Sequence, residues 1–138
     1  MKDFEYRWCL NEPDYHLVIK WLTSWKFEAL PRNMLSEYGA IVSKDGVDLC
    51  SGWLYQSDSK IAWIEWVVIN KEAPKNLRNG CVDFLYDTLF SKAKELGFDV
   101  VMSFVKHGMF KDKLETKYGF KPCGDNNMEL MFKSLWVQ

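Results

Sequence analysis

The sequence has 138 residues and a formal net charge of −1, and 48% of its residues are hydrophobic. This length suits a single domain over residues 1–138, and the apolar content excludes a disordered chain. The near-neutral charge argues against a nucleic-acid partner, because proteins that bind nucleic acids concentrate positive charge.

The N-terminus and the cysteines indicate an intracellular protein without a metal site. The first ten residues, MKDFEYRWCL, lack the apolar core of a signal peptide, and no apolar run is long enough to span a membrane. The four cysteines are far apart and have no histidine at ligand spacing. We therefore expect reduced thiols, no metal, no membrane contact and a cytoplasmic location.

The first part of the chain predicts a strand followed by a helix. Residues Phe4 to Leu10 alternate well enough for a strand, and Asn11 then offers an N-cap with Pro13 in the first helical turn. Pro31 marks the outer limit of this helix or a break before a second short helix. The apolar positions that form one face of the helix are Tyr15, Val18, Ile19, Leu22 and Trp25.

The middle of the chain predicts an antiparallel meander. Strand-like segments at residues 38–43 and 47–56 flank Asp45-Gly46, which is a strong hairpin signal. The next segment, residues 61–70, is nearly all apolar apart from Glu65. We therefore expect it to be a central strand that is buried on both faces.

The following segments predict a parallel crossover. Apolar residues keep helical spacing from residue 77 to residue 96, and Gly97 is placed to end this helix. Residues 99–105, DVVMSFV, are typical of another buried strand. A strand, a long helix and a second strand in this order predict a right-handed parallel connection.

The C-terminal part predicts a shorter helix at residues 107–118 that ends at Gly119, and then two strands at residues 120–123 and 128–135. The whole pattern predicts an α/β fold of the mixed α+β type. It has a central mixed, mostly antiparallel sheet with helices on both faces and one parallel β-α-β crossover.

The loop at residues 71–80 is a candidate anion site. In an open α/β sheet, ligands bind beyond the carboxyl ends of parallel strands, where the next helix also points unpaired amides. The loop carries Lys75 and Arg78 at the positive end of this helix, where cations are disfavoured. A bound phosphate or pyrophosphate would resolve this conflict; alternatively, both side chains simply extend into solvent.

Several features of the chain occur together in one known family. They are the order of the elements, the strand IAWIEWVVIN, the loop and helix after it, the segment DVVMSFV, and a helix that closes on KYGF. In these features the chain resembles the GNAT superfamily of acetyl-CoA-dependent N-acetyltransferases. The resemblance covers nearly the whole chain, and GWLYQSDSKIAWIEWVVIN is similar to small GNAT-like proteins encoded by bacteriophages. It implies that acetyl-CoA is the cosubstrate and that an amine-bearing small molecule or protein is the acceptor. Many relatives dimerise, so a homodimer is also among the expectations.

The resemblance also implies where acetyl-CoA would bind. In the family, the strand equivalent to residues 61–70 has a bulge whose backbone pairs with the pantetheine arm, and the loop motif Q/R-x-x-G-x-G/A wraps the pyrophosphate. The motif falls on residues 76–81, where two asparagines and a cysteine replace family residues. The residues implied to bind the cofactor are Val67, Val68, Ile69, Lys75, Asn76, Leu77, Arg78, Asn79, Gly80 and Cys81.

Two residues are candidates for acid–base chemistry. Glu65 is the only carboxylate of the apolar central strand, and many GNAT proteins carry an acidic residue two to four residues before the bulge. Glu65 is therefore either catalytic or substrate-binding, or else a structural glutamate held by a neighbouring Trp or Tyr. Glu115 stands at the position of the family's usual tyrosine acid. The nearest tyrosine, Tyr118, is either the acid or a packing residue.

These observations leave two functions open. The first is direct transfer of an acetyl group from acetyl-CoA to a primary amine, with an unidentified acceptor. The second is a GNAT-fold protein with weak or no catalysis that works as an interaction module, on a host protein in the host cytoplasm if the chain is viral. The tryptophans are expected in the core, although some would suit an acceptor groove for an aromatic or cationic substrate.

Overall fold

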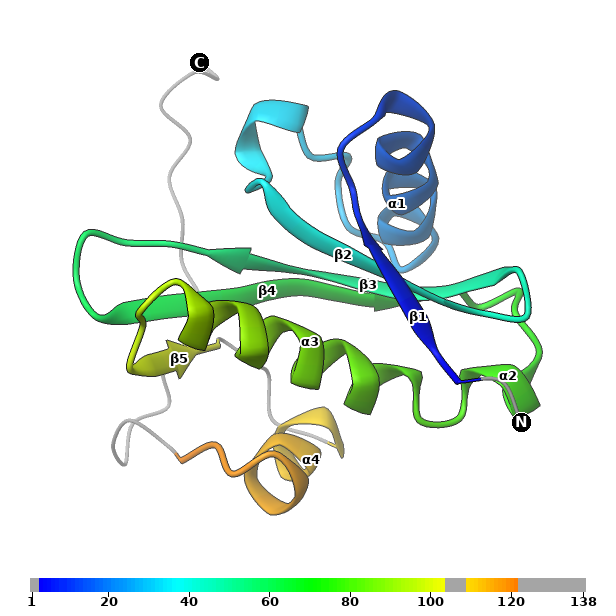
Figure 1. Cartoon of the computed structure of the whole chain (residues 1–138). Coiled ribbons are helices and arrows are strands. Elements are labelled where there is room, and N and C mark those ends of the chain that lie inside the picture. The colour runs from blue at the N-terminus through cyan, green and yellow to red at the C-terminus, as the bar shows by residue number, and fades with distance from the viewer. Residues whose placement is uncertain (1–2, 104–108, 122–138) are drawn as a thin grey trace. The chain divides into compact units, whose positions relative to one another are not determined.

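A computed structural model of the protein describes residues 3–103 and 109–121, and the chain divides into two compact units, residues 1–103 and 104–138. Five strands of the first unit form one sheet in the order β1-β2-β3-β4-β5 (Figure 1). Neighbouring strands are antiparallel except β4 and β5, which are parallel, as predicted. The strands are β1 (Glu5–Trp8), β2 (Tyr38–Lys44), β3 (Val47–Tyr55), β4 (Ile61–Ile69) and β5 (Val100–Met102).

Helices cover both faces of this sheet, which confirms the predicted fold class (Figure 1). Two neighbouring residues of β3 show that α1 covers one face of the sheet and α3 covers the other. Trp53 packs in the core with α1, whereas a Cβ on Gly52 would lie 3.1 Å from Leu85 of α3. The helices of the first unit are α1 (Glu12–Ser24), the short 3-10 helix η1 (Arg32–Met34), α2 (Lys75–Arg78) and α3 (Cys81–Glu95).

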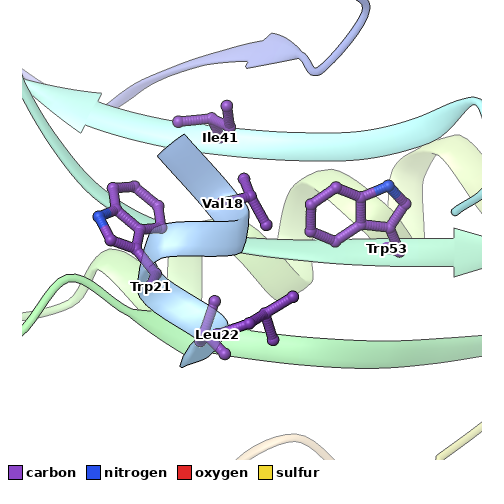
Figure 2. Packing of buried hydrophobic residues seen from close by; sticks show 6 residues of the cluster. Val18, Trp21, Leu22, Ile41 and Trp53 are labelled. Carbon is purple, nitrogen blue, oxygen red and sulfur yellow. The ribbon is translucent and has the colours of Figure 1, made fainter. Parts of the chain in front are cut away.

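Helix α1 begins at the predicted cap and packs on the middle of the sheet. The side chain of Asn11 accepts a hydrogen bond from the amide of Asp14 at 2.9 Å, which satisfies one unpaired amide of the first turn. Removal of the apolar face of α1 from water then holds the helix on β2, β3 and β4. The buried cluster consists of Val18, Trp21, Leu22, Ile41, Trp53 and Val68 (Figure 2).

Arg7 of β1 joins three elements at one edge of the sheet. Its guanidinium donates to Asp14 of α1 at 2.9 Å and to Asp48 of β3 at 2.7 Å. The hydrogen bonds with Asp48 and Asp14 raise the pKa of Arg7 above its ordinary value. β1 has only four residues, so these two ion pairs help to attach it to the rest of the unit.

We expect Gly39→Ala to lower the free energy of unfolding by about 2 kcal/mol. An added Cβ would lie 2.1 Å from Nε1 of Trp53, whose side chain is buried in the core. Urea unfolding of the variant measures the loss. Trp53→Phe removes the indole atoms that clash, so Gly39→Ala should cost much less in that background. An equal cost in both backgrounds would argue against the steric explanation.

The long helix predicted over residues 77–96 is interrupted near its start. Lys75–Arg78 form the single turn α2, and Gly80 has a left-handed backbone with φ +88° directly before α3. The prediction was wrong here because apolar spacing continues across the break, and spacing does not reveal one residue with a positive φ. The end is as predicted, since Gly97 has φ +91° and its amide donates to the carbonyl of Lys94.

The second unit contains α4 (Met109–Lys117), which lies within the helix predicted at residues 107–118. Gly119 follows it with φ +74°, as expected of a residue that ends a helix. Residues 120 and 121 form no strand, and the remainder of the two predicted C-terminal strands lies outside the described residues. That the whole chain is one domain stays a prediction.

Within residues 3–103 and 109–121, no helix combines the length and the apolar character that a membrane crossing requires. The same residues include no group of three or more His, Cys, Asp or Glu side chains placed to hold a metal ion.

Candidate functional site

Strand β4 contains a bulge in its middle. From Ser51 to Trp53, β3 advances by two residues, while the facing part of β4 advances by three, from Val68 back to Glu65. One extra residue is therefore inserted in β4. Trp66 has φ +59°, a left-handed angle that residues other than glycine rarely adopt. The bulge that the resemblance implied for this strand is present, and backbone strain of this kind is concentrated at functional sites.

Among the described residues, the edge of β4 that faces β5 has no strand partner beyond the bulge, and this stretch is called the open edge. β5 pairs only with the first three residues of β4, Ile61 to Trp63. The hydroxyl of Ser103 then donates to the carbonyl of Ile64 at 2.9 Å. After this point, none of the strands in the described part of the chain pairs with this edge. The edge therefore offers backbone groups to a ligand that pairs as a strand does.

The backbone of Ile69 points to this open edge. The amide of Asn70 donates to the carbonyl of Leu49 at 2.8 Å, so the antiparallel pattern directs the amide and carbonyl of Ile69 away from β3. The carbonyl of Ile69 accepts a hydrogen bond from Nε1 of Trp25 at 2.9 Å. An indole from the end of α1 therefore occupies a backbone group that the resemblance assigns to the pantetheine arm.

The side chains of the other two predicted pantetheine residues are directed into the protein. Val68 is 4% exposed in the core beneath α1. Val67 lies on the opposite face, where a Cβ on Gly52 would be 3.2 Å from its Cγ2. A ligand at the open edge would therefore recognise the backbone of these residues.

Glu65 lies immediately before the bulge, on the face of the sheet that α1 covers. This placement follows because Glu65 faces Trp53 across the strands, and cross-strand partners share a face. Burial raises the pKa of Tyr55 to about 12 and raises the pKa of Tyr86 as well, and the carboxylate of Glu65 contributes to both shifts. The charge of Glu65 thus influences one partly buried tyrosine, Tyr55, and one fully buried tyrosine, Tyr86, which no sequence motif had indicated.

An aromatic wall, made of Trp25, Phe27, Tyr55 and Trp66, lies beside the bulge. The hydroxyl of Tyr55 accepts a hydrogen bond from Nε1 of Trp66 at 3.0 Å and donates to the carbonyl of Met34 at 2.8 Å. The ring of Phe27 meets that of Trp66 edge-on, with the ring centres 6.1 Å apart. Trp25 and Phe27 are 45% and 48% exposed, so this part of the wall is open to a ligand.

We expect the protein to lose stability as the pH rises from about 10 to 12, in part through Tyr55. Its pKa is about 12 in the folded protein, while an unfolded tyrosine ionises near 10. Between these values the unfolded chain releases the proton and the folded chain keeps it, so higher pH favours unfolding. Urea midpoints at pH 8 and pH 11 measure the loss. Tyr55→Phe should show a smaller loss between the two pH values, and an identical loss would assign it to other groups.

The loop before α3 presents a cationic corner. Nε of Arg78 is buried and has no hydrogen-bond partner among the described residues, while Lys75 is exposed. Gly80 is the N-cap of α3, and no side chain caps this end of the helix. Helix N-termini favour negative charge, so Arg78, Lys75 and the start of α3 together suit an anion.

Three amides of the predicted phosphate motif are already used within the loop. The amides of Leu77 and Arg78 both donate to the carbonyl of Pro74 at 3.1 Å, and the amide of Asn79 donates to Lys75 at 3.2 Å. An anion would therefore meet the start of α3 and the basic side chains before it met these amides. The side chains of Asn76 and Asn79, by contrast, are exposed.

Cys81 is directed away from the loop surface. Its side chain is 1% exposed, and its thiol makes a hydrogen bond with Cys50 of β3. This contact and burial raise the pKa of Cys50 well above its ordinary value, so the thiol of Cys50 stays protonated at neutral pH. The bulk of Cys81 consequently does not fill the space in front of α3.

Tyr118 belongs to the second unit, where it follows α4. Its amide donates to the carbonyl of Leu114 at 3.3 Å, and the ammonium of Lys113 lies 6.0 Å from the centre of its ring. Its role as the general acid stays a prediction.

Comparisons with known proteins give matches by structure alone. No protein-family model matches the sequence, and no curated protein is similar enough to count as a relative. Among solved structures, N-acetylglutamate synthase from Neisseria gonorrhoeae, complexed with coenzyme A and L-arginine, is 13% identical with a TM-score of 0.72. The match covers 92% of this chain and 29% of that one.

Two shorter proteins match over most of their own length. An acetyltransferase from Trypanosoma brucei is 18% identical with a TM-score of 0.64, and the match covers 94% of this chain and 100% of that one. An N-acetyltransferase from Staphylococcus aureus is 14% identical with a TM-score of 0.67, over 88% of this chain and 86% of that one. By contrast, the chain spans only 25% and 29% of the two N-acetylglutamate synthase chains that it matches. With its bulged β4, its parallel β4–β5 pair and these neighbours, the chain has the fold of the GNAT acetyltransferases.

Proposed function

We propose that the protein is an N-acetyltransferase that moves an acetyl group from acetyl-CoA to a primary amine by direct transfer. The observation that carries this proposal is the strained bulge at Trp66 beside the open edge of β4, with Glu65 immediately before it. Solved structures with the same fold add support, because the N-acetylglutamate synthase chains are complexed with coenzyme A.

The loop before α3 fits the pyrophosphate of acetyl-CoA. Phosphate oxygens are strong acceptors for a guanidinium, and Arg78 has a buried Nε that lacks an acceptor among the described residues. Gly80 leads the chain into α3 through a left-handed angle that glycine tolerates, and no side chain makes a capping hydrogen bond at this helix N-terminus. Lys75 adds a second positive charge at the surface.

The open edge of β4 suits the pantetheine arm, whose amides can pair with the backbone of Val67 to Ile69. Binding along the whole edge requires the indole of Trp25 to release the carbonyl of Ile69. When bound, acetyl-CoA supplies an acetyl group on a thioester, which a neutral amine attacks readily.

Glu65 is proposed to bind the acceptor amine and to accept its proton. A primary amine has a pKa near 10.4 and is protonated at neutral pH, so it must lose a proton before it attacks. A carboxylate beside the bulge attracts the ammonium form and accepts its proton, directly or through a water molecule. Tyr118 remains the proposed donor of a proton to the leaving thiolate.

Isothermal titration with acetyl-CoA and with CoA, at two salt concentrations and after removal of any co-purified cofactor, tests the proposal. We expect micromolar binding that weakens as salt increases, because the loop contributes charge–charge contacts. Acetyl transfer to a panel of primary amines then tests catalysis. Absence of binding to both ligands would overturn the proposed function.

An interaction module is the second candidate, and two observations favour it. Three amides of the phosphate motif donate within the loop, and Trp25 already occupies a backbone acceptor of the pantetheine edge. Full stability without any response to CoA, together with a protein partner retained in pull-down experiments, is the result that this second function requires.

A further inference from the structure

A cavity of about 270 Å³ lies on the α1 face of the sheet, next to η1. Its volume is close to the lower end of the range for small-molecule sites, about 300–1,000 Å³. Trp53 of β3 and Tyr15 of α1 contribute aromatic surface to its lining, and Leu35 contributes aliphatic surface. Two charged side chains, Arg32 and Glu37, also line it. The cavity thus combines apolar walls with a small number of ionic groups.

The positive charge in this cavity is compensated within the protein. Arg32 donates to the carboxylate of Glu12 at 2.5 Å and to the carbonyl of Leu10 at 3.1 Å. Its guanidinium also lies 5.6 Å from the centre of the Tyr15 ring. A ligand carboxylate would therefore have to compete with Glu12 for Arg32.

The negative charge of Glu37, whose side chain is exposed, has no compensating group within the described part of the chain. Among the described residues, its carboxylate has no hydrogen-bond or ion-pair partner. The charge that the cavity offers to a ligand is consequently negative, and aromatic rings in the lining also favour a cation. These features select an ammonium group over a carboxylate.

The cavity and Glu65 lie on the same face of the sheet. Gly39, Trp53 and Glu65 face one another in register across β2, β3 and β4. Glu37 precedes Gly39 by two residues. Two strand spacings of about 4.8 Å and two residues of about 3.3 Å place the backbones of Glu37 and Glu65 about 12 Å apart.

We propose that the cavity holds one ammonium group of a linear aliphatic diamine or polyamine, whose other primary amine is the acetyl acceptor beside Glu65. This inference rests on the proposed function. The carboxylate of Glu37 binds the distal ammonium, and the methylene chain lies along the apolar and aromatic lining of the cavity, to which Tyr15 and Leu35 contribute. At the other end, the amine loses a proton to Glu65, its nitrogen forms a bond to the acetyl carbon, and the C–S bond breaks. The proton that the new amide nitrogen releases passes to the thiolate.

Binding measurements without acetyl-CoA test the cavity directly. The probes are 1,8-diaminooctane and 8-amino-1-octanol, which have similar length and differ in the second ammonium group. Isothermal titration at constant ionic strength should show that the diamine binds about threefold to fivefold more tightly, because Glu37 is exposed and water weakens an exposed ion pair. Glu37→Gln should remove this difference. Glu28→Gln, which makes the same change at an exposed carboxylate of the preceding loop, should retain it.

Equal affinity for the two probes, or a difference that persists in Glu37→Gln, would overturn the inference. Tighter binding of 8-aminooctanoate than of the diamine would overturn it as well, because that result would mean that Arg32 and not Glu37 selects the ligand. Acetyl transfer separates the two proposals. Transfer to primary amines without preference for the diamine would support the proposed function and overturn the role of the cavity as a diamine site. Binding of the diamine that depends on Glu37, with no transfer from saturating acetyl-CoA, would support the cavity as a diamine site and overturn the proposed transferase function.

Discussion

Glu65→Gln is expected to lower kcat for acetyl transfer by about a hundredfold, the lower end of the contribution of a positioned general base. Glutamine has nearly the same shape but cannot accept the proton of the amine. The residue lies directly before the bulge, and its carboxylate adds to the raised pKa values of Tyr55 and Tyr86. Steady-state transfer to the best amine of a screen, at saturating acetyl-CoA, measures the effect.

The control variant is Glu5→Gln, which makes the same change at an exposed position of the edge strand. It should retain kcat within about twofold. Glu65→Gln should also keep the CoA affinity and the urea midpoint of the parent protein, because its role is in the transfer step. Unchanged transfer in Glu65→Gln would mean that the glutamate has a structural role.

Arg78→Met is expected to weaken CoA binding by about tenfold to a hundredfold, the usual size of a hydrogen bond between charged groups. The same substitution should leave the free protein equally stable or more stable. This second effect follows because Nε of Arg78 is buried without a partner among the described residues, and an unsatisfied buried donor costs about 1–3 kcal/mol. Titration with CoA and urea unfolding without ligand measure the two effects.

Lys75→Met is the matched control, since it removes a positive charge from an exposed side chain of the same loop. It should weaken CoA binding only slightly and reduce its salt dependence. The double variant should lose most of the salt dependence. If Arg78→Met binds CoA as the parent does, the pyrophosphate lies elsewhere. If it is strongly destabilised without ligand, Arg78 has a structural partner.

Much of the fold was predictable because its signals are local. The side chain of Asn11 caps α1, and Asp45-Gly46 forms the tight turn between β2 and β3, with φ +51° and +78°. Gly97 ends α3 with a positive φ. Each of these residues determines the backbone within a few positions of itself, so neighbouring sequence is enough to identify it.

The centre of the candidate site depends on distant residues, and this part was not readable from local patterns. Tryptophan has no preference for a left-handed angle, and nothing near Trp66 marks the bulge; it was expected only from the resemblance to a family. Arg7 forms a hydrogen bond with Asp48, which is 41 residues away in the sequence, and Trp25 forms one with Ile69, which is 44 residues away. Such contacts are set by strand order and packing, which the alternation of side chains does not specify.

The hydrogen bond between Trp25 and Ile69 has a spectroscopic consequence. The ammonium of Lys71 lies 4.0 Å from the centre of the Trp25 ring, and its charge shifts the energy at which the indole emits. A ligand that takes the carbonyl of Ile69 releases the indole and changes this environment. The chain has seven tryptophans, so the contribution of Trp25 is the difference between the spectra of the parent protein and Trp25→Phe. Occupancy of the open edge is thereby readable from intrinsic fluorescence, without a label or an assay for the product.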